Sequence, residues 1–100
     1  MSSFFWNVRG FKKMSKHSIV RKWVSQEDLQ FGCILETRVQ EKKAERIVGS
    51  VFPEWSFISN YAFNRLGRIW EVWSPRVRLT PCFTSGQMIT CSVLMENMEE

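Results

Sequence analysis

Two short apolar segments, each ended by a polar residue, most constrain how this chain of 100 residues can fold. They are residues 4–10 (FFWNVRG) and 33–38 (CILETR), and a helix-length stretch separates them. A strand, a helix and a second strand in this order form a right-handed crossover that places the two strands parallel and side by side. Asn7 and Glu36 then emerge at one edge of the sheet, where open sheets of this kind bind their ligands.

Hydrophobic periodicity predicts one helix between these strands and another after them. The first helix has Ser15 as its N-cap, and its apolar stripe consists of Ile19, Val20, Trp23 and Val24. A capping box of Thr37 and Gln40 begins the second helix, which runs as far as Pro53. The apolar positions of this second helix are Ala44, Ile47, Val48, Val51 and Phe52.

The second half of the chain has a different hydrophobic period. From Trp55 onward apolar residues alternate with a period of two, which is typical of strands. A loop over residues 60–67, a turn at Ser74 and Pro75, and a connection over residues 84–87 separate these strands. The pattern therefore predicts a β-meander.

Positive charge gathers near the start of the chain. Six basic residues precede the first acidic residue, Glu27, and they are Arg9, Lys12, Lys13, Lys16, Arg21 and Lys22. Such a cluster is typical either of a nucleic-acid interface or of a solvated helix face, and the charge alone leaves both open.

The cysteines and the lack of apolar spans indicate the compartment. Cys33, Cys82 and Cys91 are an odd set without Cys-x-x-Cys spacing, and their apolar flanks predict buried, reduced thiols. The start of the chain has no signal-peptide pattern, and no apolar run is long enough to span a bilayer. We expect an intracellular protein, nuclear or cytoplasmic, without a membrane partner.

The chemistry of Asn7 and Glu36 has two interpretations. A carboxylate and an amide oxygen at one sheet edge are ligands that Mg²⁺ prefers, with phosphate as its natural partner. Alternatively, Asn7 bonds its own turn and Glu36 lies at the positive end of the second helix.

The single histidine and two tryptophans of the second half could have a functional role, but the pattern favours a structural one. His17, the single histidine, has no acidic neighbour to orient it, which predicts a surface position. Trp70 and Trp73 form either a stacking platform for bases or a part of the core.

The two strand-end motifs resemble the first two motifs of the endonuclease/exonuclease/phosphatase superfamily. These motifs are residues 6–10 (WNVRG) and 35–38 (LETR). The likeness continues through residues 52–55 (FPEW), 64–70 (NRLGRIW), 72–75 (VWSP) and 87–91 (QMITC). The whole chain resembles the endonuclease region of plant LINE-type retrotransposons.

This resemblance implies a fold, a metal and a partner. The implied fold class is α/β (α+β), a partial four-layer DNase I-like sandwich with one mixed sheet and two helices, and residues 1–100 form the N-terminal fragment of such a domain. Glu36 would bind Mg²⁺ as principal ligand and Asn7 would support the metal and the scissile phosphate. DNA would be the partner, contacted by the basic residues Arg9, Lys12, Lys13 and Arg38.

The resemblance also implies an incomplete catalytic site. Relatives hydrolyse phosphodiesters with the help of Mg²⁺ and use later Asp-x-Asn and Ser-Asp-His motifs, neither of which occurs in this sequence. We therefore expect a truncated nuclease domain that is inactive alone, with Asn7 and Glu36 as the remainder of its site. The alternative is a small basic module that binds nucleic acid or protein without catalysis.

The aromatic content adds an expectation about assembly. Five Trp and eight Phe are many large rings for a chain of this length, and a partial sandwich leaves one sheet face uncovered. We expect this face to cause self-association or to await a missing C-terminal half.

Overall fold

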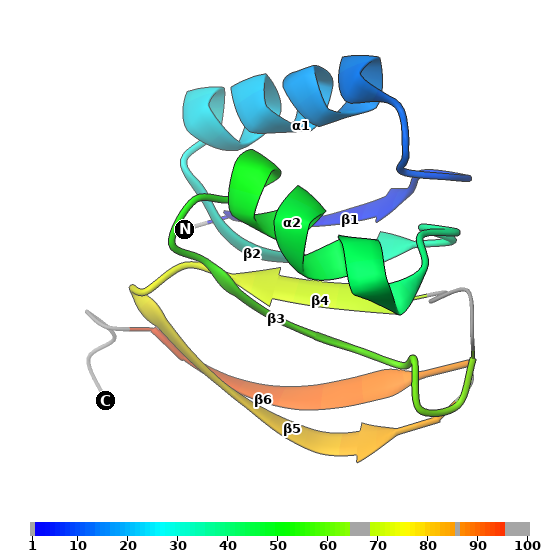
Figure 1. Ribbon diagram of the computed structural model, residues 1–100. Helices are drawn as coiled ribbons and strands as arrows, with labels where there is room; N and C mark the ends of the chain where they lie inside the picture. The colour runs from blue at the N-terminus through cyan, green and yellow to red at the C-terminus, as the bar shows by residue number, and fades with distance from the viewer. Residues whose placement is uncertain (1, 65–68, 86, 96–100) are drawn as a thin grey trace.

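Eight elements follow one another in the computed structural model, which describes residues 2–64, 69–85 and 87–95 (Figure 1). They are β1 (Ser2–Asn7), α1 (Met14–Gln26), β2 (Leu29–Leu35), α2 (Glu41–Val51), β3 (Ser56–Ser59), β4 (Ile69–Trp73), β5 (Val77–Thr84) and β6 (Ile89–Met95). The protein is thus a small mixed α+β domain, and this part of the predicted fold class is confirmed.

The four strands β1 to β4 form one mixed sheet in the order β1-β2-β4-β3. β1 and β2 are parallel, which confirms the predicted crossover through α1. β4 pairs antiparallel with both β2 and β3, so it lies between them. The sheet is therefore built around the β-α-β unit, and the end of β2 faces the start of β4.

The last two strands, β5 and β6, do not belong to this sheet. β5 and β6 pair only with each other, as a second, two-stranded sheet, so the predicted single meander is divided in two. The division occurs after Ser74, whose N–H donates to the Gln30 carbonyl at 2.8 Å and whose hydroxyl donates to Gln30 Oε1 at 2.6 Å. Pro75 then follows without a backbone N–H to continue the ladder, and the chain turns away.

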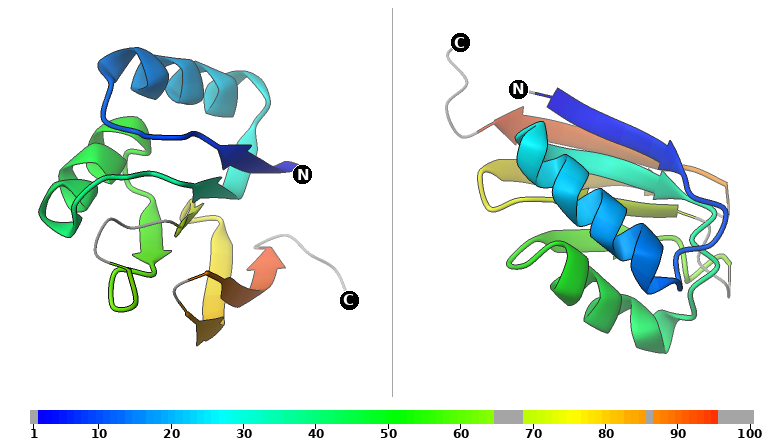
Figure 2. Two further views of the ribbon diagram at one scale, coloured as in Figure 1. Left: turned by 90° about the vertical axis from the view of Figure 1, so that its right-hand side faces the viewer. Right: turned by 90° about the horizontal axis from the view of Figure 1, so that it is seen from above.

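The two helices lie on one side of the four-stranded sheet, and β5 and β6 lie on the other side of the molecule (Figures 1 and 2). Phe4, Trp70 and Val72 point from the sheet toward the helices and are buried. Gly32 makes room for Phe4, because a Cβ at residue 32 would overlap the Phe4 ring. The main core therefore lies between the sheet and the two helices.

The buried face of α1 differs from the predicted stripe. The helix begins at Met14 after an N-cap at Lys13, and its buried residues are His17 and Val20, whereas Ile19 is exposed. The predicted surface position of His17 is wrong. Its Nε2 lies 2.6 Å from the carbonyl oxygen of Phe11 and its ring packs edge-on against the Phe11 ring, so a local backbone acceptor satisfies the imidazole inside the core.

The apolar face of α2 is confirmed, since all five predicted positions are buried. The capping box is not formed, because the N-cap Gln40 makes no side-chain cap bond and Thr37 is buried before the helix begins. Glu41 is the acidic residue of the first turn instead, and it complements the positive end of the helix.

A buried polar network fixes β4 against the loop that follows β2. The Tyr61 hydroxyl donates to the Val39 carbonyl at 2.6 Å and accepts from Trp70 Nε1 at 3.1 Å. Burial also raises the pKa of the Tyr61 phenol. Trp70 is fully buried in this network, so the interpretation of Trp70 as a stacking platform for bases is wrong.

The predicted burial of the cysteines is only partly correct. Cys33 is half-buried and Cys82 is exposed, and neither forms a disulfide bond. The side chain of Cys91 lies outside the described residues. In the described parts of the chain, neither helix has the length and apolarity needed to cross a membrane.

Candidate functional site at the ends of the two parallel strands

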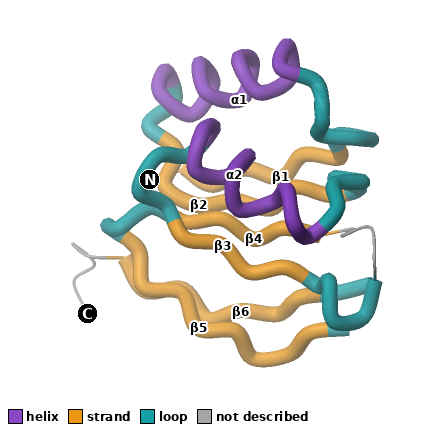
Figure 3. Tube along the Cα trace, viewed as in Figure 1, coloured by secondary structure: helices purple, strands orange, loops and turns teal. Residues whose placement is uncertain are grey.

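Parallel pairing continues beyond β1 and β2 into the loops that follow them. The N–H groups of Val8, Gly10 and Phe11 donate to the carbonyls of residues 35, 36 and 37 at 3.0, 2.7 and 2.7 Å. Both loops, drawn in teal in Figure 3, therefore lie side by side at one edge of the sheet. This pairing holds Asn7 and Glu36 in neighbouring positions, as the crossover predicts.

Both loops contain residues with a left-handed backbone. Arg9, Glu36 and Arg38 have φ values of 51°, 54° and 55°, and Gly10 has 104°. For a residue other than glycine this conformation is uncommon and costs on the order of 1–3 kcal/mol, and such residues gather at functional sites. Three of the five non-glycine residues with positive φ in the described parts of the chain lie in these two loops, and the other two are Asp28 and Glu54.

Asn7 and Glu36 line one cavity of about 190 Å³, together with Leu35, Ile69 and Gln87. Asn7 is exposed, Glu36 is half-buried, and Gln87 comes from the connection between β5 and β6. The second sheet thus supplies part of the wall, a contribution that no local sequence pattern indicates.

The donor set of this cavity fits weak Mg²⁺ binding. Glu36 supplies a carboxylate, and Asn7 and Gln87 supply amide oxygens, which are hard ligands for an ion that keeps several of its waters. A stronger site needs more acidic groups, and no cluster of three potential His, Cys, Asp or Glu ligands occurs among the described residues. The helix interpretation of Glu36 is weaker, because Glu41 occupies the first turn of α2.

A second hollow, here called the basic hollow, lies beside the same loops. It has a volume of about 270 Å³ and is lined by Arg9, Gly10, Lys12, Lys13, Lys16 and Arg38. The four basic residues predicted to contact nucleic acid therefore lie together. Each charged residue in this described lining is positive.

Lys16 is a fifth basic residue of the hollow, beyond the four predicted contacts. Its ammonium donates to the carbonyls of Val8 at 2.8 Å and Gly10 at 3.0 Å, so it also holds the loop after β1 in place. Lys16 lies in the first turn of α1, and Lys12 and Lys13 directly precede this helix, so their closeness in sequence is the signal that places the three near the helix start.

The single histidine and the single aspartate of the sequence, His17 and Asp28, lie away from this cavity. His17 is buried and bonded to the Phe11 carbonyl, which leaves it no open path to a substrate. Asp28 precedes β2, at the opposite end of that strand from Glu36, and accepts a hydrogen bond from Gln30 Nε2 at 2.9 Å.

Glu71 is a half-buried carboxyl group that is not among the site residues predicted from the sequence. It lies on β4 opposite Cys33 of β2 and Ile58 of β3. Burial raises its pKa from 4.5 to about 7, and a hydrogen bond with Cys33 opposes this effect. The sequence does contain a signal for Glu71. It is a charged residue on the strand face where Ile69 and Trp73, two residues before and after it, are apolar.

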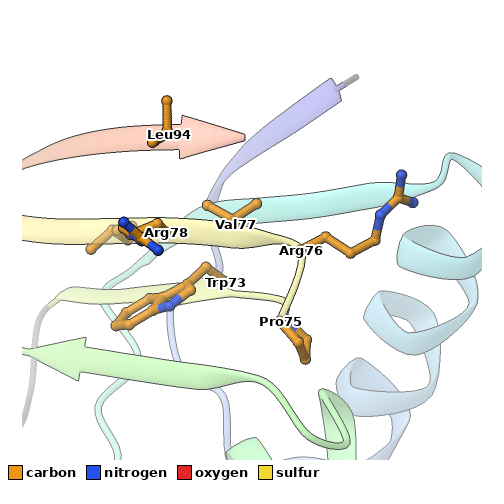
Figure 4. Close-up of a pocket in the computed structure, with 7 residues that line it drawn as sticks. Trp73, Pro75, Arg76, Val77, Arg78 and Leu94 are labelled. Carbon is orange, nitrogen blue, oxygen red and sulfur yellow. The ribbon is translucent and has the colours of Figure 1, made fainter. Parts of the chain in front are cut away.

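The other end of β4 borders a larger cavity of about 450 Å³. Its lining includes Trp73 from β4, Arg76, Arg78 and Leu94, and Figure 4 shows Arg78 next to the Trp73 indole, whereas the Arg76 side chain extends away from it. Because Trp73 is four residues from Ile69 along β4, this cavity is separate from the one at Asn7 and Glu36.

Comparison with known proteins adds no assignment, since no protein-family model and no curated protein matches the chain. The function is therefore inferred from the residues of the site and from their geometry.

Proposed function

We propose that this protein binds a nucleic-acid strand in the basic hollow and holds Mg²⁺ between Asn7 and Glu36, as part of a metal-dependent phosphodiesterase site. One observation carries the proposal: the cavity with oxygen ligands and the basic hollow are formed by the same two hydrogen-bonded loops. The resemblance to LINE-type endonucleases supports the same residues and the same partner.

Each group has a role that follows from its chemistry. Arg9 and Arg38 present planar guanidinium groups that can bind two phosphate oxygens at once. Lys12 and Lys13 add charge that releases counterions from the strand. Glu36 and Asn7 would hold the metal, which when bound polarises a phosphate oxygen.

The described residues do not complete a hydrolytic reaction. The cavity contains Glu36 as its carboxylate, and His17 is enclosed by the core. Activation of water and protonation of the leaving oxygen need a further carboxylate and an accessible histidine. Without such groups the rate of hydrolysis falls by many orders of magnitude. We infer that the chain binds DNA and does not cleave it by itself, in a nuclear or cytoplasmic setting.

The test separates the metal from the basic hollow. Fluorescence anisotropy with a labelled DNA oligonucleotide is measured against salt for the wild type, for Arg9→Ala/Arg38→Ala and for the control Lys42→Ala/Lys43→Ala. The control removes the same charge from exposed positions on α2. We expect the Arg variant to lose affinity and salt dependence and the control to retain both.

The metal is tested by calorimetry with Mg²⁺ alone. We expect weak binding that Glu36→Gln abolishes while DNA affinity in the absence of metal is retained. Equal Mg²⁺ binding by wild type and variant would exclude the proposed ligand role of Glu36.

The alternative, a binding module without a metal, is supported by the cavity around Trp73. An indole beside Arg78 can stack on a base or hold an acidic peptide. Loss of binding in Trp73→Ala/Arg78→Ala, with unchanged binding in Arg9→Ala/Arg38→Ala, would favour this module.

A further inference from the structure

The basic hollow has the shape of a site for a compact anion. Its lining comes from three segments: the loop after β1, the first turn of α1 and the loop after β2. A duplex backbone distributes its charge along a line, with one phosphate per about 3.4 Å of each strand. In the basic hollow, five basic residues instead line one space of about 270 Å³.

Two of the five basic side chains are held by contacts that are present before any ligand binds. Lys16 is fixed by its bonds to the Val8 and Gly10 carbonyls. Arg38 passes beside Gly10, because a Cβ at residue 10 would lie 4.0 Å from Arg38 Cδ. Side chains that are already positioned lose less entropy when they bind a ligand.

The first turn of α1 adds to the positive potential. It contains no acidic residue, and the N-cap residue Lys13 makes no side-chain cap bond. The Lys16 N–H is bonded to the Lys13 carbonyl at 3.1 Å, so the contribution of this turn to anion binding is the positive end of the helix dipole. Together with the five side chains, this end of the helix leaves a concentrated positive charge that an anion would stabilise.

A terminal phosphate matches this charge better than an internal one. A phosphodiester carries one negative charge, whereas a phosphate monoester carries about 1.5 to 2 at pH 7, since its second pKa is about 6. We propose that the basic hollow binds the terminal phosphate monoester of a nucleic-acid strand, so that the protein prefers strand ends. This inference rests on the proposed binding of nucleic acid.

The position of the basic hollow near the cavity at Asn7 and Glu36 is compatible with binding of the end of a nucleic-acid strand. Arg9 follows Asn7 by two residues and Arg38 follows Glu36 by two residues, and two residues of chain span at most about 7 Å. A strand whose terminal phosphate lies in the hollow would bring its next phosphodiester toward the cavity at Asn7 and Glu36. The two sites would then bind adjacent phosphates of one strand.

The experiment compares single-stranded oligonucleotides of one sequence with a 5′-phosphate, a 3′-phosphate or hydroxyl groups at both ends. Competition is followed by fluorescence anisotropy at low salt. We expect one phosphorylated form to bind at least about tenfold more tightly than the hydroxyl form, as several charge-assisted hydrogen bonds allow. This preference should decrease between pH 7 and pH 5, because the monoester takes up its second proton.

Two matched variants test the assignment to the hollow. Lys12→Ala/Lys13→Ala removes two exposed lining residues and should reduce the preference to within about twofold, whereas Lys42→Ala/Lys43→Ala should retain it. Circular dichroism confirms that both variants fold.

Three outcomes would overturn the inference, and the first two leave the proposed function standing. Equal affinity for all three oligonucleotides would leave nucleic-acid binding intact and exclude recognition of ends. A preference that Lys12→Ala/Lys13→Ala leaves unchanged would place the end elsewhere. Binding of free pyrophosphate without binding of any oligonucleotide would contradict both proposals and identify a site for small phosphates.

Discussion

Glu71→Gln should change how the stability of the protein depends on pH. The Glu71 side chain lies on β4 between Cys33 and Ile58 of the neighbouring strands, and burial raises its pKa from 4.5 to about 7. A carboxyl group with a raised folded-state pKa prefers to be protonated in the folded protein. Its stabilising effect is therefore complete below about pH 4.5 and is lost as the pH rises through about 7.

The size of the effect follows from the two pKa values. The interval from 4.5 to about 7 corresponds to about 3.4 kcal/mol, at about 1.36 kcal/mol for each pH unit. Because Glu71 is only half-buried, solvent screening reduces this figure to about 1–2 kcal/mol. For a domain of this size that difference changes the Tm by about 5–10 °C.

Thermal unfolding followed by circular dichroism between pH 5 and pH 8.5 measures the difference. We expect wild type to lose stability relative to Glu71→Gln across this range, because glutamine stays neutral. The control Glu45→Gln changes an exposed carboxylate on α2 and should follow wild type. Parallel curves for wild type and Glu71→Gln would refute the reasoning.

Two further predictions concern packing and assembly. Gly32→Ala should lower the free energy of unfolding by about 1–3 kcal/mol in urea titrations, because the added methyl overlaps the Phe4 ring and moves it; an unchanged midpoint would mean that the ring can shift freely. Phe5 is 72% exposed on the edge strand β1, so wild type should associate with increasing concentration in sedimentation velocity. Phe5→Lys should stay monomeric, and a wild-type protein that stays monomeric at high concentration would contradict the predicted self-association.

The β-α-β unit could be predicted from the sequence because its signals are local. Apolar runs ended by Asn7 and Glu36 indicate two strands, and the spacing of Ala44, Ile47 and Val48 indicates α2. The nearness of Asn7 and Glu36 in one cavity follows from the crossover, whereas the contribution of Gln87 to that cavity does not.

Other features depend on contacts between distant residues. His17 is buried because the Phe11 carbonyl accepts its hydrogen bond, and the pattern of α1 does not contain this information. The separation of β5 and β6 from the main sheet depends on the bonds between Ser74 and Gln30, which are 44 residues apart. No local pattern links those two residues.

The basic hollow could be predicted from the sequence only in part. The positive residues are evident in the sequence, but their convergence depends on left-handed backbones at Arg9 and Arg38. Arginine has no intrinsic preference for that conformation, so the tertiary structure must impose it.

The hydrogen bonds that join the two loops have a consequence for how the length of the chain can vary. Surface loops usually tolerate inserted residues, because lengthening a loop costs little entropy. Here one inserted residue after Asn7 or Leu35 would break the ladder from Val8 to Thr37 and move one loop past the other. Variants of this protein can thus gain residues in other connections, whereas these two segments must keep their number of residues or change together.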